Sequence, residues 1–179
     1  MNQDIGRAIV FSMPVVSAAV SLILISLDTT RSSNTVDRKI HYNMIAVYCL
    51  MILFWSGLVM HSIARDTFIA YLPVFFSSFA FIPVFLYRIT HIITDTGERK
   101  LFPACHFILP ACLTLIICAI ALAVPLRQRW AAIYDNEVNL TSAIIDITFI
   151  VCILLCILYS WLSLLRIKSY KRKIIDYSA

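Results

Sequence analysis

The sequence predicts an all-α polytopic membrane protein, a bundle of about five transmembrane helices followed by a basic tail. Of the 179 residues, 61% are hydrophobic and 14% are charged. A soluble domain is roughly 45–50% apolar and about 25% charged, and a chain of this length cannot bury so much apolar surface in one core. The apolar residues also gather into long uninterrupted runs, which is the second observation that predicts membrane helices.

Five apolar runs can be delimited in the sequence. Each is close to the roughly 20 residues that cross a bilayer as a helix. Helices are expected because unpaired backbone groups are costly in lipid, and a β-barrel would show shorter segments of alternating polarity. The intervening loops are too short for a folded catalytic domain, so we expect no enzyme. The chain then divides into a bundle, 1–165, and a tail, 166–179, with runs at 9–27, 43–61, 68–87, 106–124 and 140–165.

The first run, 9–27, follows Arg7 and contains the small residues Ser17, Ala18 and Ala19. A basic residue, an apolar stretch and small residues are also the parts of a cleaved signal peptide. The apolar stretch continues to Leu27, however, which makes it long enough to span a bilayer. We therefore expect an uncleaved first transmembrane helix.

Lysine and arginine residues are divided unevenly between the two sides that five crossings create. The side that holds the C-terminus carries 11 of them and the other side carries 4. Because cytoplasmic loops carry the excess of positive charge, the N-terminus is expected outside and the C-terminus inside, in a bacterial inner membrane. The larger group is Arg31, Arg38, Lys39, Arg88, Arg99, Lys100, Arg166, Lys168, Lys171, Arg172 and Lys173, and the smaller group is Arg7, Arg65, Arg127 and Arg129.

The third run, 68–87, contains two prolines, Pro73 and Pro83, on either side of Ser77 and Ser78. Proline removes a backbone hydrogen bond and kinks a helix. In a membrane, the freed carbonyl groups can be satisfied by serine side chains or by water. The pattern fits either a static kink or a moving helix that lines a ligand site.

Asp146 is the most unusual residue of the fifth run, because it lies about seven residues inside it, roughly 10 Å along a helix. A carboxyl group at that depth costs a few kcal/mol unless it is paired or protonated. It is expected either to contact a ligand or act as a switch, or to form a structural hydrogen bond with a neighbouring helix. Its candidate partners on the same side are His61, Arg65, Arg127 and Arg129.

Histidine and cysteine do not form a recognisable cofactor motif. His41, His91 and His106 fall at one end of the runs and His61 at the other, where a hydrated ring is the expected state. Five of the six cysteines fall inside apolar runs and no CxxC pair exists, which favours small apolar filler over zinc or redox chemistry. We expect no metal and no cofactor.

Two segments outside the runs are expected at the membrane surface. Trp130 and Tyr134 are four residues apart and would share one helical face, where such rings prefer the headgroup level. The tail contains a basic cluster that stops translocation and would contact anionic lipid. The spacing of the apolar and tyrosine residues in the tail indicates a helix that continues out of the membrane. A homodimer through this helix is an open alternative. The cluster is Arg166, Lys168, Lys171, Arg172 and Lys173.

Several short strings carry a resemblance to a known family. His61 ends the second run, Arg88 closes the third, Phe102 and the string 106–110 (HFILP) open the fourth, and the tail reads YKRKIIDYS over 170–178. In this order they resemble the N-terminal membrane domain of AraC-type transcriptional regulators from the Bacteroides group of bacteria. The resemblance implies a membrane part that leads through a basic segment to a cytoplasmic helix-turn-helix domain. No helix-turn-helix sequence is present here, so the chain would be a truncated or stand-alone relative, and DNA binding is assigned to none of its residues.

Two functions follow as expectations. The first is a membrane signal-input module that relays a ligand, partner or membrane state to a cytoplasmic transcription-regulating domain. The second is a small transporter or channel subunit, in which Asp146 and the kinked third helix would line a path. A membrane enzyme or haem protein has the least support, because matched catalytic side chains are lacking.

The unequal basic split makes the orientation testable. Reporter enzymes fused after Lys100 and after Ala179 should both report the cytoplasm, and a reporter fused after Asn136 should report the exterior. An exterior signal at Ala179 would overturn the orientation and the count of five crossings together.

Overall fold

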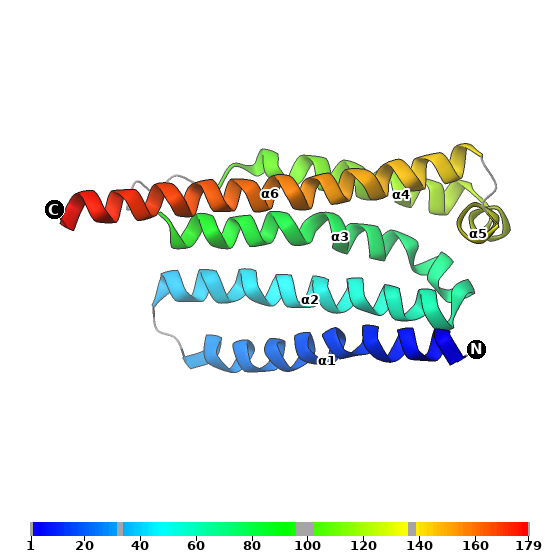
Figure 1. The fold of residues 1–179 in the computed structure, drawn as a ribbon, viewed down its shortest axis with the longest axis horizontal. Coiled ribbons are helices and arrows are strands. Elements are labelled where there is room, and N and C mark those ends of the chain that lie inside the picture. The colour runs from blue at the N-terminus through cyan, green and yellow to red at the C-terminus, as the bar shows by residue number, and fades with distance from the viewer. Residues whose placement is uncertain (1, 32–33, 96–101, 136–138, 179) are drawn as a thin grey trace.

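The structure is a computed structural model, and it shows a bundle of helices (Figure 1). It describes residues 2–31, 34–95, 102–135 and 139–178. The described residues contain no strand. Five helices are long and apolar enough to cross a membrane, which confirms the predicted fold class and number of spans. The elements are α1 (Asn2–Arg31), α2 (Thr35–Ile63), α3 (Arg65–Ile93), the 3-10 helix η1 (Ala104–Phe107), α4 (Ile108–Ala123), α5 (Leu126–Tyr134) and α6 (Leu140–Ser178).

The helices lie side by side, with α3 at the centre of the arrangement. α1 packs on α2, α2 packs on α3, and the other side of α3 packs on α4 and α6. The short helix α5 lies across one end of the bundle, where Figure 1 looks along its axis. The N-terminus lies at that same end and the C-terminus at the opposite end, as an odd number of crossings requires.

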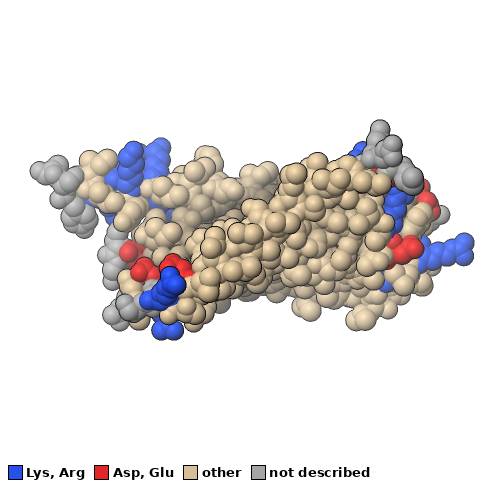
Figure 2. Space-filling view, turned by 90° about the horizontal axis from the view of Figure 1, so that it is seen from below, with Lys and Arg blue, Asp and Glu red and all other residues tan. Residues whose placement is uncertain are grey.

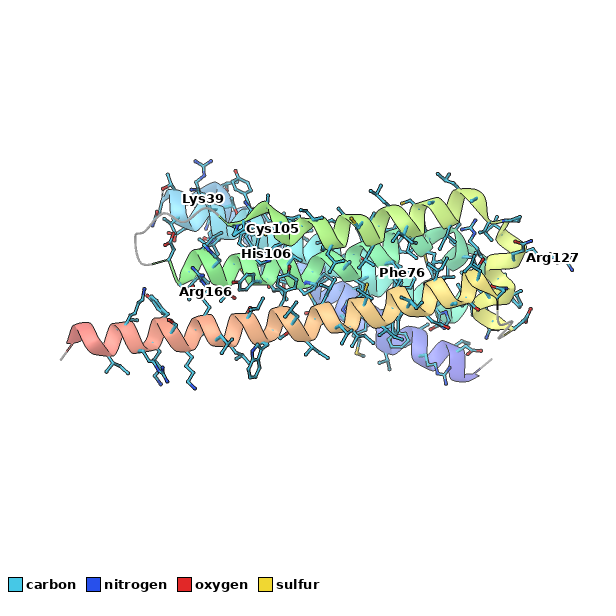
Figure 3. All side chains as sticks on the ribbon, turned by 90° about the horizontal axis from the view of Figure 1, so that it is seen from above. Lys39, Phe76, Cys105, His106, Arg127 and Arg166 are labelled. Atoms are coloured by element: carbon cyan, nitrogen blue, oxygen red, sulfur yellow. The ribbon has the colours of Figure 1, made fainter. Side chains whose placement is uncertain are left out.

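The exterior of the bundle exposes large apolar side chains over most of its middle section. Large side chains such as Val20, Leu115 and Ile150 are more than half exposed there. Figure 2 shows this belt on one face of the molecule, with lysine, arginine, aspartate and glutamate confined to its two ends. An apolar belt of this extent is a surface for lipid, because soluble proteins do not expose such areas to water. Figure 3 places Lys39 and Arg166 at one end and Arg127 at the other, as the basic split predicts.

The core is shared by α3, α4 and α6, and three buried phenylalanine side chains of α3 take part in it. Phe75 is 5% exposed and stacks on Phe54 of α2, with ring centroids 5.1 Å apart. On the other side of α3, Leu72 is almost fully buried in the same core cluster as Ile117 of α4 and Cys152 of α6. Because lipid removes the hydrophobic drive between helices, such close packing is what holds a membrane bundle together.

Helix α3 bends in its N-terminal half, as Figure 1 shows, which agrees with the kink expected at Pro73. The Ser77 hydroxyl donates a hydrogen bond to the carbonyl of Pro73, and the Ser78 hydroxyl donates to the carbonyl of Phe75 at 2.8 Å. The second proline, Pro83, is buried in the core. The carbonyl that Pro73 itself frees is satisfied from another helix, as described below.

Gly57 provides the close approach of α2 to α3. A Cβ atom added at Gly57 would lie 2.6 Å from Cδ2 of Phe75, whose ring is held between Phe54 and Phe68. Alanine normally stabilises a helix by up to about 1 kcal/mol relative to glycine. A substitution of glycine by alanine therefore destabilises the protein only where the added methyl group meets a packing conflict.

We expect Gly57→Ala to lower the free energy of unfolding by about 1–3 kcal/mol, the usual cost of an overpacked core. Gly6→Ala is the matched control, because a Cβ atom at Gly6 meets nothing within 4 Å. Thermal unfolding of both variants in detergent provides the measurement. Equal stability of the two variants would show that α2 and α3 do not touch at Gly57.

Candidate functional site

The α5 end of the bundle collects most of the polar side chains that the sequence singled out. Helix α4 ends because Val124 precedes Pro125 and takes the extended conformation that proline imposes on the residue before it. Pro125 then caps α5, and its carbonyl accepts hydrogen bonds from the backbone N–H groups of Gln128 and Arg129. This turn directs α5 across the end of the bundle and brings Arg129 towards α3.

Arg129 is a buried cation that binds backbone rather than a carboxylate. Its side chain is 6% exposed. Nη1 donates to the carbonyl oxygen of Ile69 on α3 at 3.1 Å, and Nε donates to the carbonyl oxygen of Val124 at 3.1 Å. The guanidinium group, with its fixed set of donors, suits such a double contact better than an ammonium group would.

Both carbonyl groups are ones that the helices cannot satisfy themselves. The carbonyl of Ile69 would normally accept from the backbone nitrogen four residues later, but that residue is Pro73, which has no N–H. Val124 is the C-cap of α4, and the last carbonyl groups of a helix have no partner within it. Arg129 therefore closes two gaps in backbone hydrogen bonding and joins α3, α4 and α5.

Tyr134, at the other end of α5, forms a second junction. Its hydroxyl lies 2.9 Å from Nδ1 of His61 on α2, and the two rings stack at 5.3 Å. The guanidinium carbon of Arg65 lies 5.1 Å from the centre of the Tyr134 ring, within cation–π distance. Burial is the main cause that raises the pKa of the Tyr134 phenol, so the phenol stays protonated at neutral pH.

A groove of about 570 Å³ lies between the start of α3 and α5. Ile69, Ala70 and Leu126 give it an apolar lining, and Ala131 and the indole ring of Trp130 line it as well. Three exposed charged residues complete the lining, namely Asp66, Arg127 and Asp135. The groove is therefore amphiphilic, with apolar side chains and charges of both signs.

The structure brings together four of the five predicted site residues. His61, Arg65, Arg127 and Arg129 all lie at the α5 end, although only Arg129 is buried. Asp146 does not join them. Its side chain is exposed on α6, and the structure records no hydrogen bond or ion pair between it and any described residue. The roles expected of Asp146 stay predictions, and the structure places the residue on the outer face of its helix.

The opposite end holds a polar cluster that the sequence did not reveal. The hydroxyl of Tyr159 on α6 lies 3.1 Å from Nδ1 of His106, and Nε of Arg166 donates to Oγ1 of Thr94 at 2.7 Å. His91 is 7% exposed and packs against Phe102, so the expectation of a hydrated ring is wrong for this residue. The histidines at run ends could not be assigned partners from the sequence, because Tyr159 lies 53 residues after His106 and Phe102 lies in a separate segment from His91.

Four of the five basic tail residues are exposed along α6, namely Lys168, Lys171, Arg172 and Lys173. The fifth, Arg166, is bonded to Thr94 at the end of α3. Arg99 and Lys100 lie outside the described residues. Within the described ranges, no three side chains of histidine, cysteine, aspartate or glutamate gather as metal ligands would.

No protein-family model, curated protein or solved structure matches the chain.

Arg129 and Pro73 form a pair whose coupling can be measured. Arg129→Met leaves two buried carbonyl groups unsatisfied and should cost about 1–3 kcal/mol of unfolding free energy. Arg127→Met is the matched control on the same helix and should leave stability unchanged, since Arg127 is exposed and has no hydrogen bond to any residue in the described ranges.

Pro73→Ala restores a backbone N–H that can donate to the carbonyl of Ile69. In the Pro73→Ala background, Arg129→Met should lower the free energy of unfolding by roughly 0.5–1.5 kcal/mol less than it does in the wild type. A double-mutant cycle of thermal unfolding measures this difference. Additive effects would mean that Arg129 does not compensate for the proline.

Proposed function

We propose that the chain is a membrane-embedded signal-input module, in which the α5 end receives the input and α6 carries it to the basic tail. The observation that carries this proposal is the length and continuity of α6. It runs unbroken over 39 residues, from Leu140 beside α5 to Ser178. At 1.5 Å per residue that is about 58 Å, which exceeds the roughly 30 Å of the hydrocarbon core.

The contacts of α6 support a relay between the two ends. At its start α6 packs against α5, and α5 is bonded to α3 through Arg129. At the other end α6 is bonded to η1 through Tyr159 and to α3 through Arg166. A displacement of α5 would therefore reach α6 both directly and through α3. Helix shifts of this kind are a known mode of switching between two states.

The output side of the proposal is the exposed basic stretch of α6. Its charges suit anionic lipid at the cytoplasmic face, with the N-terminus outside in a bacterial inner membrane. In the regulators that the sequence resembles, such a segment leads to a transcription-regulating domain, and the tail would pass its displacement to a domain of that class. A homodimer through the exposed face of α6 would bring two such tails together.

Transport or ion conduction has weaker support. A path would need polar side chains facing the interior of the bundle. Asp146 faces outward, and the middle of the bundle is filled by nearly fully buried residues such as Leu72, Ile117 and Cys152. Figure 3 shows Phe76 in this middle section, between the two polar ends.

The relay predicts that a change at α5 alters the geometry of the tail. Spin labels at Thr35 and Ser169 would report the distance between the start of α2 and the exposed tail. They are introduced as noncanonical amino acids, because the six native cysteines would react with thiol reagents. In bilayer nanodiscs, Arg129→Met should shift the distance distribution by about 1–2 Å or more, the size of known helix shifts.

Gln128→Met is the control, because Gln128 is exposed on α5 and does not line the groove, and it should leave the distance unchanged. An unaltered distance in a folded Arg129→Met protein would reject the relay. Proton or cation uptake into vesicles that is lost in Asp146→Asn would instead support the transporter.

A further inference from the structure

The groove between α3 and α5 has the chemistry of a site for one class of lipid. It lies at the α5 end of the bundle, and the indole of Trp130 lines it. Indole rings settle at the headgroup level of a membrane. Ala70 and Leu126 are exposed and form apolar walls of the groove. A molecule that fills it can therefore keep its hydrocarbon part in the membrane and its polar part among the charges.

Among the residues that the structure describes, the charges of the groove have no ion-pair partner. Asp66, Arg127 and Asp135 are exposed, and the structure records no ion pair between any of them and a described residue. Of the other arginines at this end, Arg129 binds two carbonyl groups and Arg65 lies over Tyr134. Arg7 does not line the groove. The groove thus offers two carboxylates and one guanidinium group.

We propose that the groove binds the headgroup of a phospholipid with a primary ammonium group, as in phosphatidylethanolamine. The ammonium group is bound by the carboxylates of Asp66 and Asp135, and the phosphate by the guanidinium group of Arg127. The glycerol and first acyl carbons lie along Ala70 and Leu126. The groove lies at the α5 end, where the proposed function places the input signal. The idea that lipid binding here senses membrane composition therefore rests on the proposed function.

Other headgroups fit the groove less well. A purely anionic headgroup would face two carboxylates with a single cation. A trimethylammonium group donates no hydrogen bonds and is recognised by cages of aromatic rings. The described lining of the groove contains one aromatic residue, Trp130, so it does not form such a cage. A primary ammonium group, by contrast, has three donors for the two carboxylates.

Native mass spectrometry of the full chain can test the selectivity. The protein is released from micelles that contain equal amounts of palmitoyl-oleoyl phosphatidylethanolamine and the corresponding phosphatidylcholine. The wild type should retain about ten times more phosphatidylethanolamine than phosphatidylcholine. This ratio corresponds to roughly one charge-assisted hydrogen bond. Asp66→Asn combined with Asp135→Asn should abolish the preference, and Arg127→Gln should weaken the binding of both lipids.

Matched controls are Asp37→Asn and Arg38→Gln, which change exposed charges at the opposite end of the bundle and should behave as the wild type. Equal retention of the two lipids by the wild type, or wild-type preference in the double variant, would overturn the proposal. Displacement of the bound lipid by an equal concentration of soluble glycerophosphoethanolamine would also overturn it, since the apolar lining would then contribute nothing. This measurement does not involve the tail, so it can fail while the relay stands, and the relay can fail while lipid binds.

Discussion

The binding of Arg129 to the carbonyl groups of Ile69 and Val124 is the interaction on which the α5 end depends. Two prolines create the need for it. Pro73 leaves a carbonyl of α3 without its helical partner, and Pro125 ends α4 with another. An unsatisfied backbone group is costly near lipid, so a buried cation with several donors is retained there. The orientation of α5 follows from this contact, and the groove and the position of Tyr134 beside His61 follow from that orientation.

The remaining helices are organised by α3, which contacts α2 on one side and α4 and α6 on the other. Its phenylalanine rings supply the close packing that replaces the hydrophobic effect between helices in lipid. The residue that lets α2 approach is Gly57, whose missing side chain gives space to Phe75. The two polar ends are therefore connected by a stiff central section in which α3 and α6 share one core.

The architecture was largely predictable from the sequence, but the site was predictable only in part. Apolar runs and the division of basic residues depend on lipid alone, so the five spans and the separation of Arg127 from Arg166 could be inferred without contacts. The roles of individual polar residues depend on which face of a helix they occupy, and in a helix that is apolar all round no periodicity reveals this. Asp146 therefore appeared to be an interior residue although it faces outward. The link between Arg129 and Pro73 could have been suspected, since every proline in a helix frees the carbonyl four residues earlier, but its partner could be found only in three dimensions.

One helix contributes little to this network. α1 packs chiefly on α2, through contacts such as Phe11 with Trp55 and Asp28 with His41, and most of its surface is exposed. Its departure would uncover one face of α2 and leave the core of α3, α4 and α6 intact. The α2 face beneath α1 is accordingly a surface on a membrane-spanning helix that another transmembrane segment could cover in place of α1.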